Sequence, residues 1–124
     1  MTRIAAIVTM ADLERIREVA AACASAARSG STVTLFFRDE TIPLICRQEV
    51  AARLTGAEGE APDAVAAILR ELQVAGEVHC YACSSSMYLW GVSGGDLIPE
   101  ITGPRGLIAF LAEDLAEATE VLSA

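Results

Sequence analysis

A cysteine followed by three serines is the segment best suited to chemistry. Cys83 follows a short apolar run that ends at Ala82, and Ser84, Ser85 and Ser86 come directly after it. A strand that ends at this cysteine and a helix that starts after it would place the thiol beside unpaired helix N–H groups, which stabilise a thiolate. The serine hydroxyls would add donors and capping oxygens in the same turn. The segment therefore predicts a nucleophilic cysteine, although a buried structural cysteine fits the same local pattern.

A second cysteine three residues earlier opens a redox alternative. Cys80 and Cys83 form a CxxC pair, which in some proteins is a thiol–disulfide motif. In an extended strand, however, residues three apart point to opposite faces, so a disulfide would require the chain to bend between them. A zinc site would need Cys46 and His79 as its other two ligands. These two residues are far apart in the sequence and do not form the second closely spaced pair that is typical of zinc sites. We therefore predict no metal site and treat redox activity as the weaker alternative.

The residues around this segment have simpler interpretations. His79 lies four residues before Cys83, about 13 Å along an extended strand, which is too far for a direct general base. Cys46 follows an apolar run, a position typical of a residue packed in the core. The lesser option is that Cys46 provides a second thiol near Cys83. Met87 and Trp90 fall one and two turns beyond Cys83 on the predicted helix. They would wall a thiol pocket, line a subunit contact, or belong to the ordinary core.

The composition excludes several classes of function. The 124 residues predict one domain spanning residues 1–124. Hydrophobic residues make up 53% of the chain, a surplus for so small a domain that favours a homo-oligomer. The net charge of −8 argues against nucleic acid and anionic membranes as partners, because both select basic patches. All nine basic residues are arginine, so Schiff-base chemistry and a Walker-type phosphate loop lack their amine.

The sequence also suggests where the protein works. The apolar segment 4–10 is too short for a signal peptide, and Asp12 follows it closely. The longest stretch free of Asp, Glu, Lys and Arg, residues 78–95, carries serines, glycines and a histidine, which disqualify it as a membrane span. We therefore expect a cytoplasmic protein whose four cysteines are reduced.

Apolar strands that alternate with amphipathic helices must position Cys83. The predicted strands cover residues 3–10, 32–37, 77–82, 97–102 and 120–123. The predicted helices cover residues 12–28, 41–54, 62–75, 84–90 and 103–119, and the composition of residues 56–61 predicts a mobile loop. Strands that are apolar throughout are typical of a parallel sheet with both faces covered. We expect a single-domain α/β fold, a three-layer α/β/α sandwich with a mostly parallel sheet of four to five strands. Cys83 would lie at its carboxyl edge, where ligands bind.

Nearly the whole chain resembles the DsrE/DsrF/TusD family of sulfur-relay proteins. The resemblance rests above all on residues 82–92 (ACSSSMYLWGV), and also on residues 33–37 (VTLFF), 96–98 and 106–111. It implies a DsrE-like fold assembled into trimers or hexamers. We expect no cofactor. The resemblance further implies that Cys83 is the active cysteine, which carries a persulfide between proteins. Rhodanese-like or TusA-like proteins would then be the donors or acceptors of sulfur.

Three functional hypotheses follow from these observations. The leading one is an intracellular sulfur carrier or sulfurtransferase that holds a persulfide on Cys83, with Ser84, Ser85 and Ser86 supporting the thiolate. The second is a non-enzymatic, homo-oligomeric α/β module that binds a small ligand. The third is the redox protein that uses Cys80 and Cys83. A carrier needs only Cys83, a redox protein needs both thiols, and a binding module tolerates Cys83→Ser unchanged.

Overall fold

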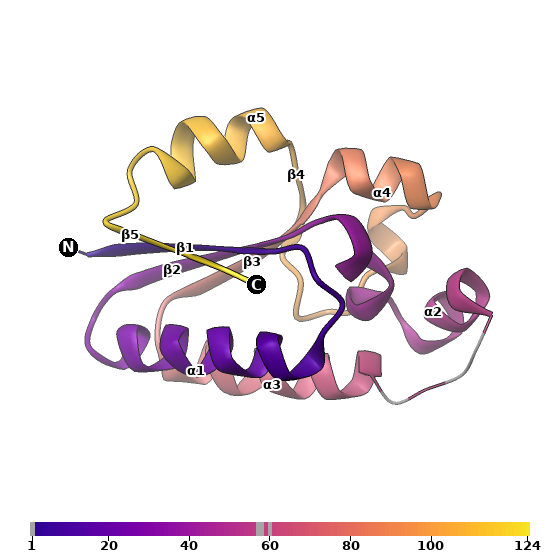
Figure 1. Ribbon diagram of the computed structural model, residues 1–124, viewed down its shortest axis with the longest axis horizontal. Coiled ribbons are helices and arrows are strands. Elements are labelled where there is room, and N and C mark those ends of the chain that lie inside the picture. Colours follow the sequence, from indigo (N-terminus) through magenta and orange to yellow (C-terminus); the bar gives the residue numbers. More distant parts are fainter. Residues whose placement is uncertain (1, 57–58, 60) are drawn as a thin grey trace.

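A five-stranded parallel sheet runs through the middle of the molecule (Figure 1). The computed structural model describes residues 2–56, 59 and 61–124. The strands, in chain order, are β1 (Arg3–Val8), β2 (Thr32–Phe37), β3 (Val78–Cys83), β4 (Gly103–Arg105) and β5 (Glu120–Ser123). Their order across the sheet is β4-β3-β2-β1-β5. The central strands are almost continuously apolar because helices cover both of their faces.

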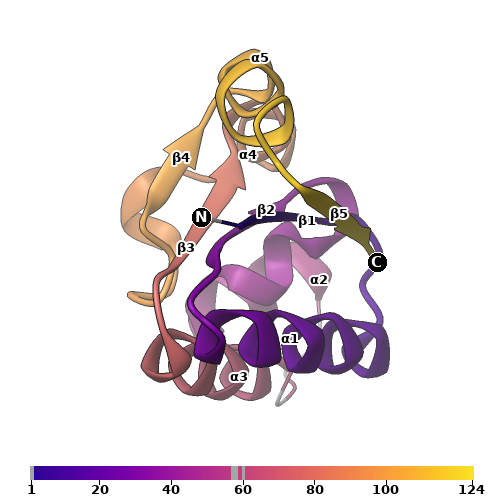
Figure 2. The ribbon, with the colours of Figure 1, turned by 90° about the vertical axis from the view of Figure 1, so that its left-hand side faces the viewer.

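Helices form the two outer layers. Most of one layer consists of α1 (Leu13–Arg28) and α3 (Ala61–Ala75), which lie side by side beneath the sheet, and α5 (Leu107–Ala109) lies on the opposite face (Figure 2). The helix continues from α5 as a π-helical turn, η3 (Phe110–Leu115). The remaining helical elements are the 3₁₀ segments η1 (Asp39–Ile45) and η2 (Gly94–Asp96) and the helices α2 (Gln48–Thr55) and α4 (Ser84–Trp90). The predicted three-layer α/β/α sandwich is therefore confirmed.

The segment before β4 differs from the sequence prediction. The strand expected at residues 97–102 is wrong, because β4 covers only Gly103–Arg105. Leu97 instead makes an isolated antiparallel bridge to Cys46, and the amide of Ile98 donates to the carbonyl of Ile45. The apolar side chains of this segment are buried as part of the core, which explains their strand-like composition. The helix predicted from residue 103 accordingly begins only at Leu107.

The helix predicted at residues 41–54 is two elements. The 3₁₀ segment η1 contains Pro43 and ends at Ile45, and α2 begins at Gln48. Between them Cys46 has an extended backbone, and its bridge to Leu97 interrupts the helix. The loop predicted at residues 56–61 includes residues 57, 58 and 60, which lie outside the described residues.

The two faces of the sheet enclose two separate apolar clusters. The larger lies between the sheet and the α1/α3 layer and contains inward-facing residues such as Ile4, Leu35 and Leu69. The smaller consists of Ala5, Phe36, Cys83 and Phe110, and lies between the sheet and the α5/η3 segment. Within residues 2–56, 59 and 61–124, no helix combines the length and apolar character needed to cross a membrane.

Candidate functional site

Cys83 stands where the sequence predicts it, between a strand and a helix. It is the last residue of β3, and α4 begins at the next residue. Its backbone is still extended, with φ −65° and ψ 119°, as a helix N-cap residue requires. The side chain lies in the smaller cluster and is only 1% exposed. The thiol is therefore at the carboxyl edge of the sheet but covered.

Two arginines flank this strand end. Arg105 of β4 is the register partner of Cys83. On the other side, Phe37 of β2 pairs with Ala82, so Arg38, the next residue, comes level with Cys83. The amide of Arg38 still donates to the carbonyl of Val8, which continues the ladder to this level. Because the side chains of a strand alternate, Arg38 projects from the same face as Phe36 and Cys83.

Arg105 joins the edge of the sheet to η3. Its Nε donates to Oδ2 of Asp114 at 2.6 Å and its terminal nitrogen to Oε2 of Glu113 at 2.7 Å. Its guanidinium carbon also lies 5.3 Å from the centre of the Tyr81 ring. Its hydrogen bonds to Glu113 and Asp114 raise the pKa of Arg105. One side chain thus connects β3, β4 and η3 around the thiol.

An aromatic pair closes the same face. The rings of Phe36 and Phe110 are stacked, with centroids 4.3 Å apart and planes 9° from parallel. Both side chains are fully buried in the cluster that contains Cys83. Phe110 is the first residue of the π-helical turn, a geometry often found at functional sites. The α5/η3 segment therefore forms the cover over Cys83.

A strained turn lies beside the site at the end of β2. Asp39 has φ +55°, a left-handed conformation that is uncommon outside glycine. The hydroxyl of Ser86 accepts from the amide of Asp39 at 3.0 Å, and the indole N–H of Trp90 donates to its carbonyl at 2.8 Å. Arg38 adds an ion pair to the Asp39 carboxylate at 3.2 Å. Helix α4 therefore fixes the turn that carries Arg38.

The other predicted residues of α4 have mixed positions. Ser84 and Ser85 are exposed in the first turn, beside Cys83, whereas Ser86 is buried and holds the Asp39 turn. Met87 belongs to the larger cluster, and Trp90 packs against it. Of the three alternatives for these two residues, the structure therefore favours the ordinary core, and it places neither of them in the cluster that contains Cys83. The helix turns this face toward the apolar residues of the larger cluster, away from the cluster that contains Cys83.

The other three cysteines lie in the larger cluster. Burial raises the pKa of Cys23 and of Cys46 to about 11, and that of Cys80 to about 12. The thiol of Cys46 donates to the carbonyl of Ile42 at 3.2 Å. Cys80 and Cys83 belong to clusters on opposite faces of the sheet, as their spacing predicts, and all four thiols are free. The structure therefore brings neither Cys46 nor Cys80 beside Cys83, and β3 would have to bend before a Cys80–Cys83 disulfide could form.

A polar hollow lies farther along the face that carries Cys83. It has a volume of about 290 Å³, and its lining residues are Arg3, Ile4, Thr32, Thr34, Glu77, His79, Tyr81 and Asp114. Nε2 of His79 lies 3.5 Å from Oε1 of Glu77. The hydrogen bond from Thr32 is the main cause of a lowered pKa at Glu77, and His79 adds to it. Across the described ranges, no group of three or more His, Cys, Asp or Glu side chains could hold a metal ion.

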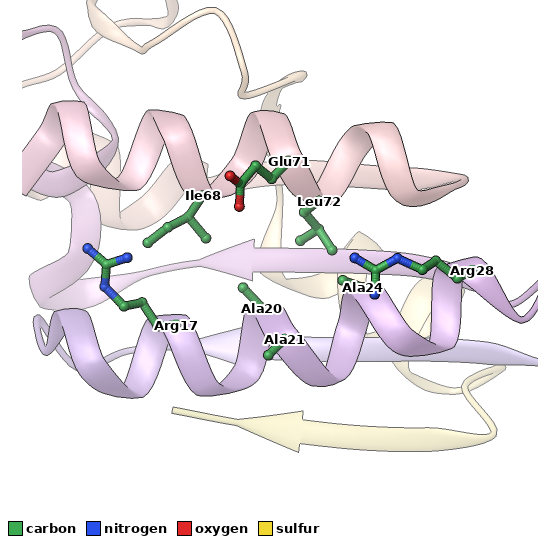
Figure 3. A pocket seen from close by; sticks show the side chains of 8 residues that line it. All are labelled: Arg17, Ala20, Ala21, Ala24, Arg28, Ile68, Glu71 and Leu72. Carbon is green, nitrogen blue, oxygen red and sulfur yellow. The ribbon is translucent and has the colours of Figure 1, made fainter.

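A further groove lies on the opposite side of the molecule. It runs between α1 and α3 and has a volume of about 320 Å³ (Figure 3). Small side chains such as Ala20 and Ala24 line it, with Arg17 and Arg28 from α1 and Glu71 from α3. Its lining residues include no cysteine, serine or histidine.

The candidate site residues predicted from the sequence include neither Arg38 nor Arg105. An arginine directly after the predicted strand 32–37 was a usable signal for Arg38, because parallel strands end at a common edge. Arg105 gave no such signal, since it lies in a segment predicted to be helical. Its position follows only from the pairing of β4 with β3.

Comparisons with known proteins identify the fold alone. No family model matches the chain, and no curated protein matches it. Among solved structures, the chain is similar to MTH1491, a protein of unknown function from Methanobacterium thermoautotrophicum, with a TM-score of 0.69. The match covers 100% of both chains at 12% sequence identity. The α/β architecture is thus shared with a solved protein over its full length.

Proposed function

We propose that this protein is a sulfur carrier that holds a persulfide on Cys83. The observation that carries the proposal is the separation of the thiols. Cys83 alone lies at the carboxyl edge of the sheet, where a helix begins and where Arg38 and Arg105 come level with it. Burial in the larger core leaves Cys23, Cys46 and Cys80 with raised pKa values, which makes them poor nucleophiles.

The proposed step needs a thiolate and no other catalyst. The Cys83 thiolate attacks the outer sulfur of a donor persulfide, R–S–SH. The S–S bond of the donor breaks, a new S–S bond forms on Cys83, and R–S⁻ leaves with the bonding electron pair. Nothing is oxidised or reduced overall, because one S–S bond replaces another. The first turn of α4, with exposed Ser84 and Ser85, would stabilise the persulfide anion through N–H and O–H donors.

The partners in this proposal are other sulfur-carrying proteins and further copies of the chain. Tyr88 and Leu89 on α4 and Ile108 on α5 are 83–84% exposed. Exposed apolar side chains of this size are typical of protein contacts. We propose that they contribute to a trimer or hexamer, or to docking of a rhodanese-like or TusA-like protein. A cytoplasmic location, which keeps the thiols reduced, belongs to the same proposal.

The mass of the intact protein tests the carrier function. The protein is incubated with thiosulfate and a rhodanese, then measured before and after treatment with a reductant. We expect a gain of one sulfur atom that the reductant removes. Cys83→Ser should abolish this gain, whereas Cys80→Ser, the matched control from the other face of the same strand, should retain it. Absence of any gain with several sulfur donors would reject the proposal.

The polar hollow supports a second candidate function, a small-ligand-binding module. The hollow brings Thr34, His79 and Tyr81 together with carboxylates that already have partners, which suits a small polar molecule. In this case Cys83→Ser would bind the ligand as well as the wild type. Chemical shifts of Thr34 and His79, recorded against a set of small polar metabolites, would detect such binding. Shifts of these residues without any sulfur loading would favour this function over the carrier.

A further inference from the structure

The burial of Cys83 is difficult to reconcile with sulfur transfer in a static molecule. A displacement at sulfur requires the donor to approach the thiolate sulfur directly, yet the Cys83 side chain is 1% exposed. Cys83 shares its cluster with Phe36, from the same face of the neighbouring strand β2, and with Phe110 of η3. Any reagent that reaches the sulfur from this face must first displace the α5/η3 segment.

The contacts that hold this segment over Cys83 converge on one side chain. Arg105 binds Glu113 and Asp114 of η3 through two of its nitrogens, at 2.7 and 2.6 Å. The side chains of Arg105 and Asp114 are only 22% and 20% exposed, so this ion pair is partly shielded from solvent. Arg105 itself is fixed from below by the ring of Tyr81 and by the pairing of β4 with β3.

The far end of the same cover has a weaker attachment. Arg3 and Glu117 form an ion pair beyond η3, but their side chains are 53% and 62% exposed. Exposed ion pairs of this kind contribute little to stability. The only apolar anchor that is fully buried is Phe110, which stacks on Phe36. Leu107, Leu115 and Ala118 add partly buried apolar contacts, and the amide of Thr119 donates to the carbonyl of Arg3 at the end of the segment. The fully buried contact of the cover is the Phe36–Phe110 stack, and its best-shielded ion pair joins Arg105 to Asp114.

We infer that Arg105 is a positioning residue that controls access to Cys83. When the guanidinium of Arg105 binds Glu113 and Asp114, η3 stays packed against Phe36 and shields the thiol of Cys83. When these ion pairs open, η3 lifts while β3, β4 and the larger core stay folded. The inference rests on the proposed function for its biological meaning, but it concerns the accessibility of the thiol and is measured without sulfur transfer.

The rate at which native protein reacts with iodoacetamide tests this inference. The rate is followed at Cys83 by fragment mass spectrometry in wild type, Arg105→Gln and Asp114→Asn. We expect both substitutions to raise the rate about tenfold, because local opening limits the reaction of a buried group. Arg105→Lys keeps a charge but not the planar fork, and should restore part of the protection. Arg15→Gln changes an exposed arginine on α1, in the layer on the opposite face of the sheet, and serves as the control without effect.

The direction of the change in the iodoacetamide rate at Cys83 distinguishes a positioning role of Arg105 from two other roles. A cation that merely stabilises the thiolate would make Cys83 react more slowly once it is removed. A purely structural arginine would lower the urea midpoint and accelerate all four thiols together. Either outcome would overturn the inference, as would an unchanged rate in both variants.

Salt provides a test that needs no substitution. Raising NaCl to 1 M should accelerate the reaction at Cys83 in wild type and leave it unchanged in Arg105→Gln. Salt screens the Arg105–Glu113 pair, whose carboxylate is 67% exposed, more than the shielded Arg105–Asp114 pair. Equal acceleration in both proteins would contradict the inference. Asp114→Asn replaces Arg105→Gln in this comparison if the latter is too unstable at low salt. Altered iodoacetamide rates without sulfur loading would reject the proposed function and leave the access mechanism intact.

Discussion

The two cysteines of β3 lie on opposite faces of the sheet and have different surroundings. Cys80 and Cys83 are three residues apart on β3, and both are buried. Cys80 faces the α1/α3 layer, where burial raises its pKa to about 12 and Gln73 lies within 4.0 Å of its sulfur. Cys83 faces the α5/η3 segment at the end of the strand, beside the first turn of α4.

The covers of the two faces differ in kind. Two long helices and many apolar side chains, Ile16, Leu69 and Leu72 among them, close the α1/α3 face. A short α-helix and one π-helical turn close the other, held by one aromatic stack and charged side chains. Apolar burial resists local opening, whereas ion pairs can be screened or exchanged for a partner's groups. In this proposal the α1/α3 face stabilises the fold, and the α5/η3 face opens to give access to Cys83.

Truncation of a leucine on each face should show the largest contrast. Leu69→Ala removes a fully buried side chain from the larger cluster and should cost about 3 kcal/mol of unfolding free energy. Leu115→Ala, on the α5/η3 side, removes a partly buried side chain and should cost about 1 kcal/mol. Urea denaturation of both variants measures the difference. Equal losses would mean that the smaller cluster contributes as much to stability as the larger one.

The reactivity of the two thiols on β3 should differ strongly. We expect iodoacetamide to modify Cys83 at least about 100-fold faster than Cys80 near neutral pH, because Cys80 needs opening of the main core and is rarely ionised. Single-cysteine variants that retain only one of these residues would give each rate by intact mass. Comparable rates at Cys80 and Cys83 would contradict the prediction that Cys83 is the reactive thiol. They would also show that the two faces of the sheet do not differ in how far they protect a thiol.

Much of this contrast could be predicted from the sequence. The odd spacing of Cys80 and Cys83 predicts opposite faces, and the apolar run followed by three serines predicts the change from strand to helix at Cys83. The strand predicted at residues 120–123 is confirmed as β5. These features depend on local periodicity and on the turn between elements, both of which a single sequence records.

The cover over Cys83 could not be predicted in the same way. Strand β4 consists of Gly103, Pro104 and Arg105, and glycine and proline are rare in strands. It pairs only with β3, at the edge of the sheet, where proline is tolerated. The contact of Arg105 with Glu113 and Asp114 depends on this pairing. No pattern in the sequence predicts a three-residue strand or a single π-helical turn.

High pH should weaken the α1/α3 face selectively. The buried thiols of Cys23, Cys46 and Cys80 have raised pKa values of about 11, 11 and 12, against an ordinary value of 9.0. Above pH 9 these thiols ionise in the unfolded chain but remain neutral in the folded one, so the unfolded state binds fewer protons and stability falls as pH rises. At pH 10 each thiol should cost roughly 1 kcal/mol.

Urea midpoints at pH 8 and pH 10 measure this alkaline loss. Cys46→Ala provides the internal comparison, because it removes one of the three thiols and should reduce the loss between the two pH values by about a third. The substitution also leaves a small cavity, but that cost is the same at both pH values and cancels in the difference. An alkaline loss that is unchanged in Cys46→Ala would mean that other groups cause it.

The turn beside the site offers the smallest test. In Ser86→Ala the amide of Asp39 loses its acceptor, which should lower the unfolding free energy by about 1 kcal/mol. Ser85→Ala is the matched control, because this neighbour on α4 is exposed and should change stability by a few tenths at most. If Ser86 mainly fixes the turn that carries Arg38, its loss should also change the rate of reaction at Cys83 and leave that of Cys80 unaltered. A loss of stability that accelerates both thiols equally would instead assign Ser86 to the common core, and the turn at Asp39 would then have no separate part in access to Cys83.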